Sequence, residues 1–114
     1  MSEAVGVLDA LAQENRLTVM RYLIRRGEEG APAGRIAEDL DLHVATLSFH
    51  LSALRQAGLV AARRESRWII YTANFARVAG LIAYLTANCC QGASVKRRRV
   101  DSSKGEAHEH ARYL

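Results

Sequence analysis

The stretch that decides the fold lies between residues 36 and 58 and reads IAEDLDLHVATLSFHLSALRQAG. Its apolar residues recur every three or four positions on both sides of a short connection at Asp41 and Leu42, which predicts two helices separated by a tight turn. The second helix is expected at residues 44–57, and Gly58 ends it. The side chains expected to face inward from this helix are Val44, Leu47, Leu51 and Leu54. Two helices in this arrangement are typical of a helix-turn-helix, in which the second helix enters the major groove of DNA.

Helical spacing also precedes this pair. Residues 5–12 carry apolar side chains at Val5, Leu8, Leu11 and Ala12, and residues 15–26 carry them at Leu17, Met20, Leu23 and Ile24. Pro32 suits the first position of the next helix, which runs to Leu40. The sequence therefore predicts three helices before the one at residues 44–57.

The pattern changes after Gly58. Residues 59–64 and 67–72 are rich in β-branched and aromatic side chains, and Glu65 and Ser66 separate them, so a β-hairpin is expected. Asn74 is a suitable N-cap for a last helix, whose apolar stripe is Val78, Leu81, Ile82 and Leu85, continues to Cys89 and stops at Gly92. The order of elements predicts a mainly α (α+β) winged helix-turn-helix with about five helices and a two-stranded β-hairpin wing.

The face of residues 44–57 that points away from the predicted core carries small and polar side chains in place of the usual Lys and Glu. Such a face allows close approach to base edges, and Phe49 can contact thymine methyl groups; the alternative is that Phe49 packs on a neighbouring segment. Thr46 and His50 are expected at the edge of the core face, where both could reach phosphates. The alternative for His50 is a boundary histidine whose hydrogen bonds are satisfied within the protein. Arginines at the hairpin tip can meet phosphates or enter the minor groove. The residues expected to contact DNA are His43, Ala45, Thr46, Ser48, Phe49, His50, Ser52, Arg63, Arg64 and Arg67.

The composition agrees with a polyanionic partner but does not require one. The 114 residues carry a formal net charge of +4, and we expect one domain at residues 1–92 and a flexible basic and polar tail at residues 93–114. No apolar run is long enough for a membrane span and no signal peptide is evident, so a cytoplasmic protein without a membrane partner is expected. No phosphate-binding loop, metal-ligand set or base beside the cysteines is present, which argues against an enzyme and against a permanent cofactor.

Residues 8–92 resemble the ArsR family of winged-helix repressors. The resemblance is carried by LA (11–12) with NRL (15–17), and by the segments IAEDL (36–40), TLSFHL (46–51), LRQAGLV (54–60) and RRESRWIIY (63–71). It implies a symmetric homodimer, formed through the first and last helices, that binds double-stranded operator DNA and leaves it when an inducer binds. His43 stands where the family often has a serine cap, and Phe49 stands where the family is often basic or polar, so the operator sequence does not carry over.

The chain has two cysteines, Cys89 and Cys90, which are adjacent and are expected to be reduced thiols in the cytosol. They resemble the vicinal pair at the end of the last helix in arsenic-responsive members, and thiolates are soft ligands that suit As(III) and Sb(III). Two thiolates satisfy methylarsenite, whereas arsenite needs a third ligand such as a small thiol, His108 or His110. The alternatives are a redox-sensing repressor that uses the same pair, and an inert pair in which Cys89 is a small hydrophobic residue of the dimer stripe.

Overall fold

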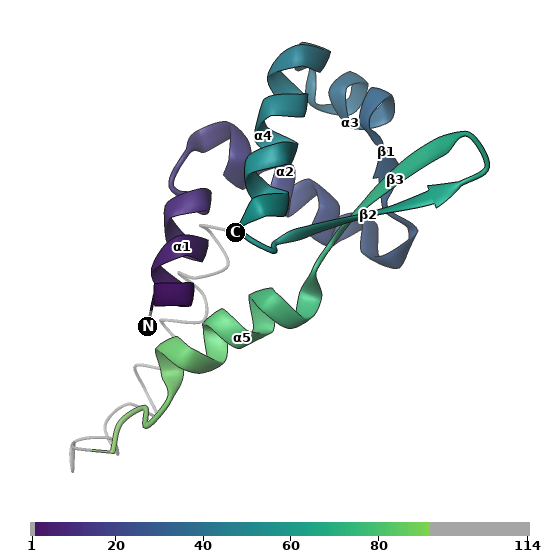
Figure 1. Cartoon of the computed structure of the whole chain (residues 1–114). Helices are drawn as coiled ribbons and strands as arrows, with labels where there is room; N and C mark the ends of the chain where they lie inside the picture. Colours follow the sequence, from purple (N-terminus) through teal and green to yellow (C-terminus); the bar gives the residue numbers. More distant parts are fainter. Residues whose placement is uncertain (1, 92–114) are drawn as a thin grey trace, which may run out of the picture.

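The computed structural model describes residues 2–91 (Figure 1), and within this range the winged helix-turn-helix is confirmed. The elements are α1 (Ser2–Leu11), α2 (Glu14–Arg26), a 3₁₀ turn η1 (Gly27–Glu29), β1 (Ala31–Pro32), α3 (Ala33–Leu40), α4 (Val44–Gln56), β2 (Val60–Glu65), β3 (Trp68–Ala73) and α5 (Phe75–Thr86). Figure 1 shows the β2–β3 hairpin protruding from the helices on one side, while α5 runs away from them on the other.

The sheet has three strands, in the order β1-β3-β2, where the sequence predicted two. β1 pairs antiparallel with β3, with Ala31 opposite Tyr71 and Pro32 opposite Ile70. Pro32 is therefore not the first residue of α3 but its extended N-cap, with φ −75° and ψ 158°, because the fixed φ of proline suits both conformations. Gly30 permits the pairing, since a Cβ there would lie 2.3 Å from the carbonyl oxygen of Tyr71. The hairpin turn is also shifted by one residue, to Ser66 and Arg67.

The core is formed where α2, α3 and α4 meet the base of the wing. Leu47, Leu51 and Leu54 of α4 are buried as predicted, but Val44 is 52% exposed because the helix begins there, beyond the packed region. The same correction applies in α2, where Met20 and Leu23 are buried but Leu17 and Ile24 lie at the surface. The buried apolar cluster consists of Val7, Ala10, Val19, Met20, Leu23, Ala31, Ile36, Ala37, Leu47, Leu51, Leu54, Leu59, Val60 and Ala73.

The terminal helices leave much of their apolar surface uncovered. None of the residues of α5 is buried, and Ile82 and Leu85 remain 57% and 60% exposed. Val5 and Leu8 of α1 are exposed as well. The predicted stripe does not reach Cys89, because α5 ends at Thr86 and Ala87 takes an extended conformation. Within the described residues, no helix is long and apolar enough to cross a membrane.

Candidate nucleic-acid interface and thiol pair

The outward face of α4 has the composition that the sequence predicted. Ala45, Thr46, Ser48 and Ser52 are all exposed. His43 begins the helix: its Nδ1 accepts a hydrogen bond from the Ala45 backbone N–H at 3.2 Å. Asp41, in the turn before α4, ends α3 in the left-handed conformation, with φ 56°. The start of α4 thus depends on His43, whose Nδ1 is taken up by the helix rather than offered to DNA.

Phe49 and His50 are neighbours in the sequence with opposite environments. Phe49 is 64% exposed, and Arg16 of the neighbouring helix α2 lies over its ring, with Cζ 5.6 Å from the ring centroid. His50 is only 6% exposed, and its Nδ1 accepts a hydrogen bond from Arg16 Nε at 3.3 Å. Burial, followed by the positive charge of Arg16, lowers the pKa of His50 below its usual value. The burial and the hydrogen bond favour the alternative of a satisfied boundary histidine, and a contact between His50 and a phosphate stays a prediction.

The wing arginines differ in their roles because successive strand residues point to opposite faces. Arg63 points away from α4: Nε binds Glu65 at 2.8 Å, and the terminal nitrogens donate to the backbone carbonyls of Glu28 and Glu29. These contacts join the hairpin to η1 through the Arg63 guanidinium, so Arg63 has a structural partner in the protomer, and its contact with DNA stays a prediction. Arg64 lies on the other face, and Arg67 lies at the tip with its Cζ 6.0 Å from the Trp68 ring.

A polar groove of about 350 Å³ separates α4 from the wing. It is lined by Ser48, Ser52, Arg55, Gln56 and Tyr71. The residues predicted to contact DNA did not include Arg55, Gln56 or Tyr71. Arg55 lies seven positions after Ser48, which places both on one side of the helix, and Tyr71 alternates with Ile70 so that it faces α4. These two spacings were the signals that could have identified the groove.

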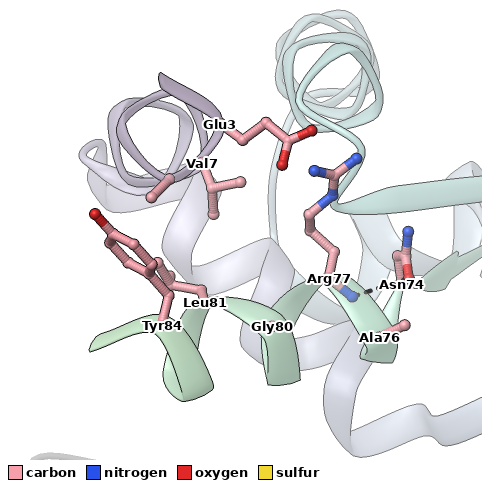
Figure 2. A pocket seen from close by; sticks show the side chains of 9 residues that line it. Glu3, Val7, Asn74, Ala76, Arg77, Gly80, Leu81 and Tyr84 are labelled. Carbon is pink, nitrogen blue, oxygen red and sulfur yellow. Dashed lines mark hydrogen bonds between the residues drawn. The ribbon is translucent and has the colours of Figure 1, made fainter. Parts of the chain in front are cut away.

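A second cavity of about 440 Å³ lies between α1 and α5. Figure 2 shows the side chains of Glu3 and Arg77 pointing toward one another across it, with Val7, Leu81 and Tyr84 on the apolar side. The cavity opens where the two terminal helices leave apolar surface uncovered.

Hydrogen bonds join the start of α5 to residues 58 and 59, which follow α4. Asn74 caps α5 as predicted, because its Oδ1 accepts from the Arg77 backbone N–H at 3.2 Å. Its Nδ2 donates to the carbonyl of Gly58 at 2.9 Å, and its backbone N–H donates to the carbonyl of Leu59. The Arg77 guanidinium lies against Gly58, where a Cβ would come within 2.7 Å of it. A movement of α5 would therefore act directly on the residues that follow α4.

The two thiols lie beyond the last helix, which corrects their predicted place on it. Cys89 and Cys90 are exposed, and their Sγ atoms are 3.2 Å apart. They meet because the chain turns sharply, with positive φ at Asn88 and Cys90, so the 100° separation of helical neighbours does not apply. Among the described residues there is no group of three His, Cys, Asp or Glu side chains that could hold a metal ion. The tail at residues 93–114, with His108 and His110, lies outside the described residues.

Comparison with known sequences supports a regulator rather than an enzyme. A family model described as a helix-turn-helix domain matches residues 11–63. The transcriptional activator HlyU of Vibrio cholerae is 33% identical over 90 residues, covering 79% of this chain and 81% of the relative. The putative arsenical resistance operon repressor ArsR of Halobacterium salinarum is 38% identical over 79 residues, covering 69% of this chain and 60% of the relative.

Comparison with solved structures also indicates a transcriptional regulator. An ArsR-like transcriptional regulator from Rhodococcus sp. RHA1 superposes with a TM-score of 0.69 at 27% identity, covering 90% of this chain and 92% of the other. The homodimeric winged helix-turn-helix DNA-binding domain of Mb0332 from Mycobacterium bovis, a possible ArsR-family regulator, gives a TM-score of 0.60 at 27% identity and covers 82% of this chain and 86% of the other. The chain therefore belongs to the ArsR family of winged helix-turn-helix, DNA-binding transcriptional regulators.

Proposed function

We propose that this regulator is a cytoplasmic repressor that leaves its operator when Cys89 and Cys90 bind trivalent arsenic or antimony. The observation that carries the proposal is the contact between two exposed thiols, whose Sγ atoms are 3.2 Å apart. Soft thiolates bind thiophilic ions, and an exposed pair needs no opening of the fold to be reached. The arsenical resistance repressor of Halobacterium salinarum is a relative whose name is consistent with this function.

The geometry of the pair favours a pyramidal ion over a tetrahedral one. Bonds of about 2.3 Å, the length of a zinc–thiolate bond, to two sulfurs 3.2 Å apart enclose an angle of roughly 90° at the ion. A tetrahedral zinc ion prefers an angle of roughly 109° and four ligands. Trivalent arsenic, with its lone pair, forms narrower angles and three bonds. The described residues offer two thiolates but no group of three side chains that could hold an ion. This favours methylarsenite, which has two exchangeable oxygens. Arsenite would need a third ligand from a small thiol or a tail histidine.

The active form that we propose is a homodimer on double-stranded DNA. The uncovered apolar residues Ile82 and Leu85 of α5 and Val5 and Leu8 of α1 provide a surface for a second copy. A homodimeric domain is among the structural relatives. Two copies of α4, each with its wing, then face successive turns of the major groove.

The same helix connects the thiol pair to DNA. α5 carries the cysteines just past its last residue, Thr86, and is bonded at its other end through Asn74 to Gly58 and Leu59. An ion bound by both sulfurs would fix the turn beyond α5 and hence the way α5 meets the second copy. The Asn74 contacts pass the resulting shift to the end of α4. A coupling of about 1–3 kcal/mol is typical of such switches and corresponds to roughly 5- to 150-fold in DNA affinity.

The test is release from DNA, measured by fluorescence anisotropy on a labelled duplex from the regulator's own upstream region. Reduced protein is titrated with arsenite, methylarsenite, antimonite, zinc and peroxide in parallel. Release by an arsenical or by antimonite, but not by zinc, supports the proposal. The matched control is Cys89→Ser with Cys90→Ser, which removes both cysteines of the chain. If the double variant is released as readily as the wild type, the thiol pair is not the sensor.

Thiol oxidation is the second candidate, and the same 3.2 Å contact favours it. Peroxide would accept two electrons and two protons from the thiols, forming one S–S bond and two waters. Release by peroxide that is reversed by a dithiol reductant, without release by arsenicals, would select this function.

A further inference from the structure

We propose that Arg16 of α2 is a positioning residue for DNA reading, because it holds the Phe49 ring in the orientation that presents it to thymine methyl groups. This inference rests on the proposed DNA-facing role of α4. It concerns a residue of a different helix, 33 positions before Phe49, which no motif in the recognition segment includes.

Arg16 contacts two consecutive residues of α4. Its Cζ lies 5.6 Å from the centroid of the Phe49 ring, within the range of a cation–π interaction. Its Nε donates a hydrogen bond to Nδ1 of His50 at 3.3 Å. The His50 and Phe49 rings meet edge to face, with their centroids 5.5 Å apart and their planes at 65°. The guanidinium is therefore fixed on the buried ring and supports the exposed one.

Each part of this contact is itself held in place. The backbone N–H of Arg16 donates to Oε1 of Gln13, the N-cap of α2, so the residue lies in the ordered first turn of its helix. His50 is buried, and accepting at Nδ1 requires its proton to sit on Nε2, which defines one neutral tautomer. The lowered pKa of His50 is in keeping with that neutral state.

The consequence concerns selectivity. A Phe side chain that is 64% exposed is otherwise free to change rotamer, and a ring that moves cannot discriminate one methyl group. With the guanidinium against one face, the ring is restricted before DNA arrives, and binding loses less side-chain entropy. Lysine would keep the charge but would provide neither the planar contact nor the Nε–H donor.

The test compares two duplexes that differ only in the thymine 5-methyl groups. A duplex is selected from a random pool by the wild-type protein, and a second copy is made with deoxyuridine in place of thymidine. The wild type is expected to bind the uracil duplex about fourfold more weakly for each methyl group that Phe49 would have covered, from the transfer free energy of one carbon. Arg16→Ala and Arg16→Lys are expected to bind the thymine duplex more weakly and to lose most of this ratio, as does Phe49→Ala.

Arg25→Ala is the matched control, since Arg25 is exposed on the opposite side of the same helix and should keep the wild-type ratio. Imidazole ¹⁵N chemical shifts provide a second readout, because the Nε2–H tautomer of His50 should dominate in the wild type and give way to a mixture in Arg16→Ala. If folded Arg16 variants keep the wild-type thymine-to-uracil ratio, Arg16 does not position Phe49. If the wild type itself binds both duplexes equally, Phe49 does not read methyl groups; if it selects no duplex, the DNA-facing role of α4 fails instead.

Discussion

Leu85→Ala tests whether the apolar face of α5 is a subunit interface. Leu85 is 60% exposed in the single chain, and its replacement by alanine removes three carbons. At about 0.8 kcal/mol per buried carbon, full burial of those carbons is worth about 2.4 kcal/mol. The exposed 60% of the side chain, which a second copy would cover, then contributes about 1.4 kcal/mol per chain and about 2.9 kcal/mol per symmetric dimer. The dimer dissociation constant should therefore rise about a hundredfold.

Sedimentation velocity across a concentration series measures this change directly. The single chain should remain folded, because no residue of α5 is buried in it and alanine favours helices. Ile69→Ala is the matched control: it also removes three carbons from a side chain that is 47% exposed, but on the wing, which an interface between terminal helices leaves uncovered. An unchanged dissociation constant for Leu85→Ala, or an equal rise for Ile69→Ala, would refute the assignment of the interface to α1 and α5.

Three further predictions concern other contacts. Gly58→Ala should destabilise the fold by about 1–2 kcal/mol in urea unfolding, because φ is +78° there and the new Cβ displaces the Arg77 guanidinium. Adding Arg77→Ala should relieve the clash but not the backbone cost. A loss of unfolding free energy below roughly 0.5 kcal/mol in Gly58→Ala would contradict this. Folding lowers the pKa of His50, so the neutral side chain contributes stability above about pH 6.5, and this stability is lost as the pH falls below that value. His50→Gln should therefore flatten the fall of the urea unfolding midpoint between about pH 7 and 5. An unchanged fall would show that another group is responsible. Arg64→Ala should reduce the slope of DNA affinity against salt concentration by about one ion per chain. Arg63→Ala should leave this slope unchanged and lower the unfolding midpoint, because its guanidinium is bound to η1. The reverse pattern would place Arg63 on DNA.

The sequence was sufficient for the parts of the fold that depend on local periodicity. The stripe of Leu47, Leu51 and Leu54 identified α4 and its outward face, and the change to β-branched and aromatic residues after Gly58 identified the wing. β1 was missed because a strand of two residues, one of them proline, has no period of its own and exists only through its pairing with β3.

The differences at the candidate site have physical causes that local patterns do not contain. The contact between Arg16 and His50 joins residues 34 positions apart, so only the packing of α2 on α4 shows that His50 is buried. The helix that was expected to reach Cys89 stops at Thr86, whose hydroxyl donates back to the carbonyl of Ile82, and Cys89 fitted the apolar stripe without being part of it. For the wing arginines, composition alone could not separate Arg63 from Arg64, because their difference depends on which strand face meets η1.

The early end of α5 has a consequence for how this regulator can change over evolution. Residues 87–91 are all exposed and follow the last helical residue, so none of their side chains supports the core. Under the proposed function, substitutions in this short segment would alter the ion or oxidant that the thiols detect without cost to the packing of the protomer. If the thiols are the sensor, inducer chemistry and operator choice can diverge independently, and the segment is the place to engineer a biosensor for a different analyte.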